Sequence, residues 1–142
     1  MTDTQKAIAL LPHAMPECEN ARLALFAMRR MGAQGLHDAR AAHTMFTAFG
    51  QGFRRPLVLL RALMADLAGT SAGTIAIAPC CCARMTSAES AMLTILARVE
   101  TAPEVARYLM ADLLGIRRID GVLTSAAAVA MAFADEGRPV IV

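Results

Sequence analysis

The stretch Thr86–Val99, which reads TSAESAMLTILARV, decides the fold class of this chain. Thr86 and Glu89 have the spacing of a capping box, in which the two side chains satisfy backbone groups of the first helical turn. Apolar residues follow at Leu93, Leu96 and Val99, which is the periodicity of a helix with one buried face. The stretch therefore predicts an amphipathic helix that begins just after Thr86.

Helix start and stop signals recur on both sides of this stretch. They include a proline at a helix start (Pro103), a glycine after a helix end (Gly115) and a capping residue (Asp120). We expect further helices at approximately 20–31, 36–49, 56–67, 103–114 and 120–135. The predicted fold is all-α: a single bundle-like domain of five to six helices in residues 20–142, after a loosely ordered leader at residues 1–19.

One segment departs from the helical pattern. Residues 69–79 are rich in Gly, Ser and Thr, and the part at 74–78 has an extended character. The C-terminal residues 139–142 are also short, apolar and non-helical in pattern. A minimal β-ribbon pairing 74–78 with 139–142 is the one sheet element that the sequence suggests.

Composition supports the helical interpretation. The chain has 142 residues, of which 56% are hydrophobic and 18% charged, with 30 alanines and 10 methionines but no tryptophan. Alanine is the best helix former, whereas a sheet protein uses more β-branched and aromatic residues. A chain so apolar must bury its surplus surface, so we expect a homo-oligomer or another protein partner.

The composition and the hydropathy pattern exclude several classes of protein. No uninterrupted apolar run reaches the roughly 20 residues that a membrane-spanning helix needs, and no signal-peptide pattern is present. The net charge of +2 is too small to favour nucleic-acid binding. The expected location is the cytoplasm, where cysteines stay reduced.

The most unusual feature is the run Ala78–Arg84, which reads APCCCAR and holds three of the four cysteines. Adjacent cysteines lack the usual spacing of zinc ligands. Cys80 and Cys82 face the same way in an extended segment, so we expect them to chelate jointly if the backbone turns at Cys81, and soft thiolates suit cuprous copper. The candidate metal ligands are Cys80, Cys81 and Cys82, with Cys18 and His43 as distal ligands, for copper or zinc. The same thiols suit reversible oxidation, and an arginine nearby, such as Arg84, would favour the reactive thiolate.

Two other interpretations of the run stay open. The three thiols can pack a loop as small apolar side chains. They can also serve a cysteine enzyme with His43 as base, although we assign no catalytic or organic cofactor-binding residue and favour a role that is not enzymatic.

Charged residues elsewhere give weaker signals. Carboxylates such as Asp38 and Glu89 are scattered over the predicted helices, without the Glu-x-x-His motifs of a di-iron bundle. Arginine doublets, among them Arg29-Arg30, are interpreted as solvated helix ends.

Two segments also carry a family resemblance. The order Arg54-Arg55-Pro56-Leu57-Val58-Leu59-Leu60-Arg61, followed by the Pro-Cys-Cys-Cys run within residues 77–86, resembles an uncharacterised family of short alphaproteobacterial helical proteins. The resemblance implies no activity, cofactor or site residue.

The functional hypothesis therefore comes from the residues alone: a cysteine cluster for soft-metal binding or thiol redox sensing. The alternative is a non-catalytic adaptor or homo-oligomeric assembly protein that acts through an alanine-rich helical surface.

Overall fold

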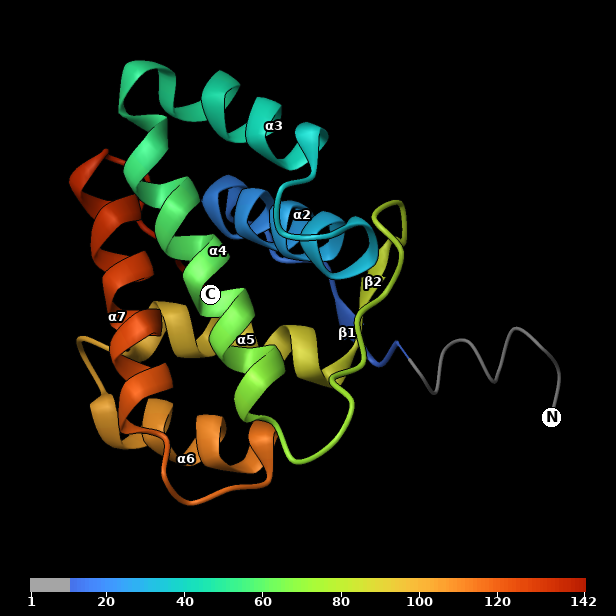
Figure 1. Ribbon diagram of the computed structural model, residues 1–142, viewed down its shortest axis with the longest axis vertical. Coiled ribbons are helices and arrows are strands. Elements are labelled where there is room, and N and C mark those ends of the chain that lie inside the picture. The colour runs from blue at the N-terminus through green and yellow to red at the C-terminus, as the bar shows by residue number, and fades with distance from the viewer. Residues whose placement is uncertain (1–10) are drawn as a thin grey trace, which may run out of the picture.

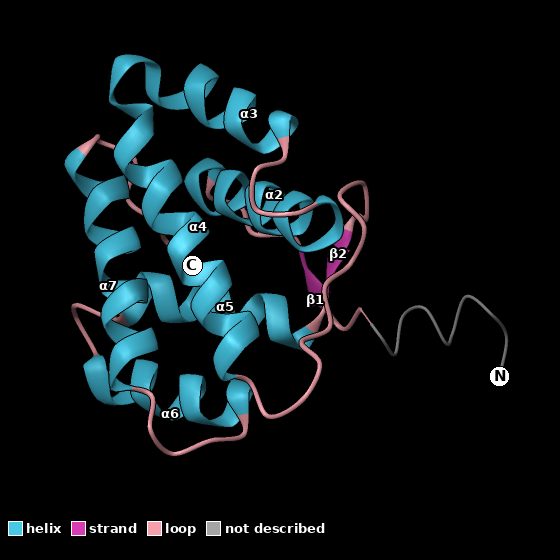
Figure 2. Cartoon of the chain, viewed as in Figure 1, coloured by secondary structure: helices cyan, strands magenta, loops and turns pink. Residues whose placement is uncertain are grey.

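The computed structural model describes residues 11–142 and has the predicted all-α architecture (Figure 1). Helices account for nearly all of the regular structure, and the one sheet is a very short ribbon (Figure 2). In chain order the helices are α2 (Glu19–Gln34), α3 (Ala39–Phe49), α4 (Arg54–Thr70), α5 (Ser87–Arg98), α6 (Pro103–Leu114) and α7 (Asp120–Asp135), with a 3-10 turn η1 (Gly50–Phe53) before α4. Within this described part, no helix has the length and apolarity to cross a bilayer.

The helices α4 and α7 pack lengthwise and run in opposite directions (Figure 1). Arg55 at the start of α4 forms an ion pair with Asp135 at the end of α7, with an N–O distance of 2.7 Å. Further along, the hydroxyl of Ser125 donates to a carboxylate oxygen of Asp66. Polar contacts thus fix the register of the pair at two places, on either side of an apolar contact zone.

The alanine-rich helix α7 contributes to the core of its own chain. Ala126, Val129 and Phe133 are completely buried, and the Phe133 ring meets the Phe49 ring edge to face with centroids 5.0 Å apart. Small alanine side chains let neighbouring helices approach closely, which explains how α7 fits against α4 and α5.

The capping box predicted from the sequence is confirmed. The Thr86 hydroxyl accepts a hydrogen bond from the Glu89 backbone N–H at 3.0 Å, and Glu89 Oε1 accepts one from the Thr86 N–H at 2.9 Å. Thr86 Oγ1 also donates to the carbonyl of Ala76 at 2.7 Å. The start of α5 is therefore attached to the loop that precedes the cysteines.

We expect Thr86→Ala to lower the free energy of unfolding by about 1–2 kcal/mol, because the α5 N-terminus loses its cap and Ala76 loses a donor. Thr124→Ala is the matched control: the Thr124 hydroxyl is exposed and, among residues 11–142, bonds only the Asp120 carbonyl of its own helix. Urea denaturation of both variants measures the difference. Equal, near-zero effects would contradict the structural role of the cap.

The predicted β-ribbon is wrong in its location. The observed ribbon pairs β1 (His13–Ala14) with β2 (Arg84–Met85) in antiparallel register, with His13 opposite Met85. Segment 74–78 does not pair with 139–142 because both segments have other partners. The Thr86 and Glu89 side chains bind backbone groups of 76 and 78, whereas the Pro139 carbonyl accepts from the Asn20 side chain at 2.9 Å.

Two helix starts also differ from expectation. Asn20 does not cap α2, because the helix already begins at Glu19 and the Asn20 amide binds the C-terminal segment instead. Asp120 is the first residue of α7 and not its cap; its carboxylate forms an ion pair with Arg107 at 2.8 Å.

The predicted leader at 1–19 falls partly within the structure. Residues 1–10 lie outside the described residues. The Arg84 guanidinium donates to the carbonyls of Leu11 and Pro12, both at 2.8 Å, next to the β1–β2 ribbon. Residues 11–14 are thereby held against the chain segment that follows the cysteines.

Candidate functional site

The three adjacent cysteines lie in a tight turn, which we call the cysteine turn (Pro79–Cys82). The Cys82 N–H donates to the Pro79 carbonyl at 3.1 Å, and this bond closes the turn. Cys81 is exposed, while Cys80 and Cys82 are half-buried, and all are free thiols. The turn connects the extended segment 71–78 to β2 (Figure 1).

A buried ion pair lies directly beneath the cysteine turn. The Arg29 guanidinium on α2 donates two hydrogen bonds to the Glu89 carboxylate on α5, at 2.7 Å and 3.0 Å. Both side chains have an exposed fraction of 0%. The interpretation of Arg29 as a solvated helix end is therefore wrong, because the residue lies on the inward face of α2.

The same two side chains hold the backbone on both sides of the turn. Arg29 donates to the carbonyls of Cys82 at 2.9 Å and Arg84 at 2.7 Å. Glu89 accepts from the N–H groups of Ala78 at 3.2 Å and Thr86 at 2.9 Å. With these bonds each buried charge has hydrogen-bond partners beyond its counter-ion, as buried charges require. We call this arrangement the Arg29–Glu89 clamp.

The clamp places two thiols side by side. The Sγ atoms of Cys80 and Cys81 are 3.4 Å apart, within hydrogen-bonding distance for sulfur. Beside them lies Arg30, whose guanidinium forms two hydrogen bonds to the Asp38 carboxylate at 3.0 Å and 2.9 Å. A cation therefore adjoins the thiol pair.

This environment separates the two thiols electrostatically. The hydrogen bond from Cys81 lowers the pKa of Cys80 below its ordinary value, and Arg30 lowers it further, despite an opposing effect of burial. The pKa of Cys81 is raised, first because it hydrogen-bonds the Cys80 sulfur and second because it faces that negative charge. Cys80 is the thiol that ionises first, with Cys81 as its protonated neighbour.

The other predicted ligands do not join this pair. Cys18 lies at the N-terminal end of α2, with its Sγ 3.9 Å from the Pro139 carbonyl oxygen. Burial acts to raise the Cys18 pKa, but backbone N–H groups at Ala21, Ile141 and Asn20 outweigh burial, and the net shift is downward. Arg30 is twelve residues further along the same helix, a separation of about 18 Å at the helical rise per residue.

His43 is exposed on α3, and no hydrogen bond joins it to a cysteine in residues 11–142. Cys82 contributes its carbonyl to the clamp. Across the described residues, no group of three or more His, Cys, Asp or Glu side chains converges as metal ligands do. Of the five predicted site residues, the structure brings together Cys80 and Cys81.

The comparison with family models gives one match. The model described as Family of unknown function (DUF6628) matches residues 2–106, about three-quarters of the chain. The chain belongs to this family. The DUF6628 match includes the cysteine turn and both residues of the clamp, and it ends within α6, so α7 lies outside it. The searches of curated proteins and of solved structures found no match.

Proposed function

We propose that the cysteine turn is a thiol redox site in which Cys80 is the reactive thiolate and Cys81 the resolving thiol. The observation that supports the proposal most directly is the 3.4 Å separation of the two sulfur atoms beside Arg30. Redox-sensing cysteines are typically accessible, low in pKa and close to a second thiol. The exposed Cys81 and half-buried Cys80 meet these conditions.

The proposed chemistry is a two-electron oxidation by a hydroperoxide. The Cys80 thiolate attacks the peroxide, the O–O bond breaks, and a sulfenic acid and an alcohol or water result. The Cys81 sulfur then attacks the Cys80 sulfur and displaces water, which leaves a disulfide. Neighbouring Cα atoms are only about 3.8 Å apart, closer than an unstrained disulfide prefers, so the bond would be easily reduced.

We also propose a cytoplasmic location, because the reducing conditions of the cytoplasm restore the thiols after each oxidation. Soft-metal binding remains part of the proposal, now limited to cuprous copper held by Cys80 and Cys81. Two adjacent thiolates suit cuprous copper, whereas structural zinc normally takes four protein ligands.

Alkylation kinetics test the electrostatic part of the proposal. In a Cys18→Ser/Cys82→Ser background, we expect Cys80 to react with iodoacetamide at a lower pH than Cys81, because the thiolate fraction rises as pH passes the pKa. Arg30→Met should slow Cys80 alkylation several-fold near neutral pH. Asp38→Asn is the matched control: it breaks the same ion pair but leaves the cation, so the Cys80 rate should stay equal or rise. Equal slowing by both variants would indicate a structural effect only.

Oxidation tests the covalent part. Treatment with hydrogen peroxide should remove the mass of two hydrogen atoms from the Cys18→Ser/Cys82→Ser protein, and dithiothreitol should restore it. Cys80→Ser and Cys81→Ser in that background should each prevent the loss.

Titration of the reduced protein with cuprous ion against a chromophoric chelator tests the copper interpretation separately. Unreactive thiols in both experiments would overturn the proposal.

The second candidate function is homo-oligomeric assembly or an adaptor role. The observation that favours it is the exposure of large apolar side chains on the adjacent helices α4 and α7, with Val58 57% exposed and Met131 48% exposed. The buried alanines of α7 are used within the chain, so this candidate depends on the outer surface of the helix pair.

A further inference from the structure

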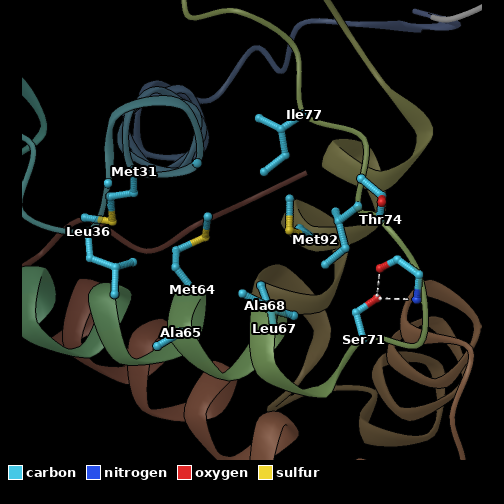
Figure 3. Close-up of a pocket in the computed structure, with 14 residues that line it drawn as sticks. Met31, Leu36, Met64, Ala65, Leu67, Ala68, Ser71, Thr74, Ile77 and Met92 are labelled. Carbon is cyan, nitrogen blue, oxygen red and sulfur yellow. Dashed lines mark hydrogen bonds between the residues drawn. The ribbon is translucent and has the colours of Figure 1, made fainter.

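We infer that the cavity between α2, α4 and segment 71–77 binds a free carboxylic acid with an unbranched hydrocarbon chain, independently of the thiol chemistry. The cavity has a volume of about 530 Å³, within the range of small-molecule sites. Figure 3 shows α4 along one side of it, Met31 above, and Ser71 and Thr74 at one end.

The lining is apolar and flexible. It includes the methionines Met31, Met64 and Met92, together with leucine, isoleucine, alanine and glycine, and it contains no charged or aromatic residue. Methionine side chains adapt to irregular apolar shapes. The absence of aromatic rings from this lining favours an aliphatic chain over a flat ring system.

One wall of the cavity is closely fitted. Ile77 covers the cavity from segment 71–77, and a Cβ atom at Gly32 would lie only 3.1 Å from Ile77 Cδ1. The Ser71 hydroxyl at the far end already donates to the Gly73 carbonyl at 2.6 Å. With Ser71 so engaged and no charged residue in the lining, we assign that end to the hydrocarbon tail.

An arginine, Arg61, lies next to the opposite end, just outside the residues that line the cavity. Arg61 precedes Met64 and Ala65 by three and four residues, so it shares their face of α4. Its Nε donates to the carbonyl of Leu36 at 2.9 Å, and Leu36 itself lines the cavity. None of the ion pairs within residues 11–142 involves Arg61. Arg61 as a residue is half-buried, and the guanidinium N–H groups not bonded to Leu36 are available to a carboxylate at this rim.

The length of the site suits a medium-length chain. From Arg61 to Ser71, α4 advances about 15 Å at the helical rise per residue. An extended decanoate spans approximately this length, with its carboxylate at Arg61 and its methyl end near Ser71. An uncharged alcohol of the same length fills the cavity but gains nothing from the cation.

Calorimetric titration of the full chain with decanoate below its micellar concentration tests the proposal. We expect saturable binding, weakened about tenfold by Arg61→Gln and retained by Arg61→Lys. Decanol binding should be insensitive to both changes. Ala68→Phe, which fills the cavity from α4, should abolish binding of both ligands, while Arg54→Gln, at the exposed start of α4, should change neither. Far-UV circular dichroism checks that each variant is folded.

Three results would overturn the proposal: no saturable binding of decanoate, equal weakening by Arg61→Gln and Arg54→Gln, or binding seen only with oleate-containing phosphatidylcholine vesicles. The last would indicate a membrane surface as the source of the hydrocarbon chain. None of these measurements involves a cysteine. A negative result would therefore overturn the ligand-binding proposal without affecting the thiol redox proposal, which the alkylation and oxidation experiments test.

Discussion

Glu89→Gln is expected to lower the free energy of unfolding by about 3–5 kcal/mol, because the change leaves the Arg29 guanidinium buried without a counter-ion. Glutamine has nearly the same shape as glutamate, so the loss comes from charge and hydrogen bonding and not from a cavity. The Ala78 and Thr86 N–H groups donate to different oxygens of Glu89, so one of them loses its acceptor where the glutamine NH2 replaces an oxygen. Urea denaturation followed by circular dichroism measures the effect.

Asp135→Asn is the matched control, since it removes the carboxylate of the Arg55–Asp135 pair at the same 2.7 Å distance. Those side chains are 49% and 55% exposed, and exposed pairs contribute under about 1 kcal/mol. Comparable losses for Glu89→Gln and Asp135→Asn would contradict the clamp.

The clamp also predicts a link between stability and the thiol site. Glu89→Gln weakens the bonds that hold segment 78–86, so the Cys80–Cys81 geometry should loosen with it. The difference in alkylation rate between the two cysteines should therefore shrink in this variant. In Asp135→Asn the difference should persist.

Local signals in the sequence were sufficient for the helices. The capping box at Thr86 and Glu89, Pro103 at the start of α6, and Gly115 in the left-handed conformation after it all act within one helical turn. Such signals depend on neighbouring residues, which the sequence displays directly. The all-α class and most helix ranges were predictable for this reason.

Long-range pairs were not predictable in the same way. Arg29 and Glu89 are 60 residues apart, and the sequence marks Glu89 only as a capping residue. The one available signal was the position of Arg29 one turn after the buried Leu25 on α2, which suggests an inward-facing arginine. The β1–β2 ribbon was missed because its strands have two residues each, too few to show an alternating pattern.

The candidate site was likewise predictable only where its signals are local in the sequence. Adjacent cysteines identify the turn from sequence alone, but the proximity of Arg30 to Cys80 depends on how segment 71–82 crosses α2. Cys18 and His43 were proposed as distal ligands on residue type only. Cys18 lies just before α2 and His43 in the middle of α3, which shows that residue type without a fold cannot define a ligand set.

Ala126→Asp is expected to lower the free energy of unfolding by several kcal/mol, because it buries a carboxylate without a partner at a completely buried position of α7. Thermal or urea denaturation measures the loss. The effect should not depend on protein concentration, since Ala126 packs within its own chain. The family match ends before α7, and this variant tests whether the domain nevertheless depends on that helix.

Met131→Asp places the same charge on the outer side of α7, where the side chain is 48% exposed. The free energy of unfolding of this variant should stay within about 0.5 kcal/mol of the value for the protein without the substitution, as for most surface changes. If the chain assembles through the outer surface of α4 and α7, sedimentation velocity should show that Met131→Asp dissociates the assembly while each chain stays folded. If the protein without substitutions is folded and monomeric in the same experiment, the assembly proposal is wrong. A loss of stability in Met131→Asp comparable to that in Ala126→Asp would contradict the placement of α7, because the two substitutions introduce the same charge on a buried and on an exposed side of the helix.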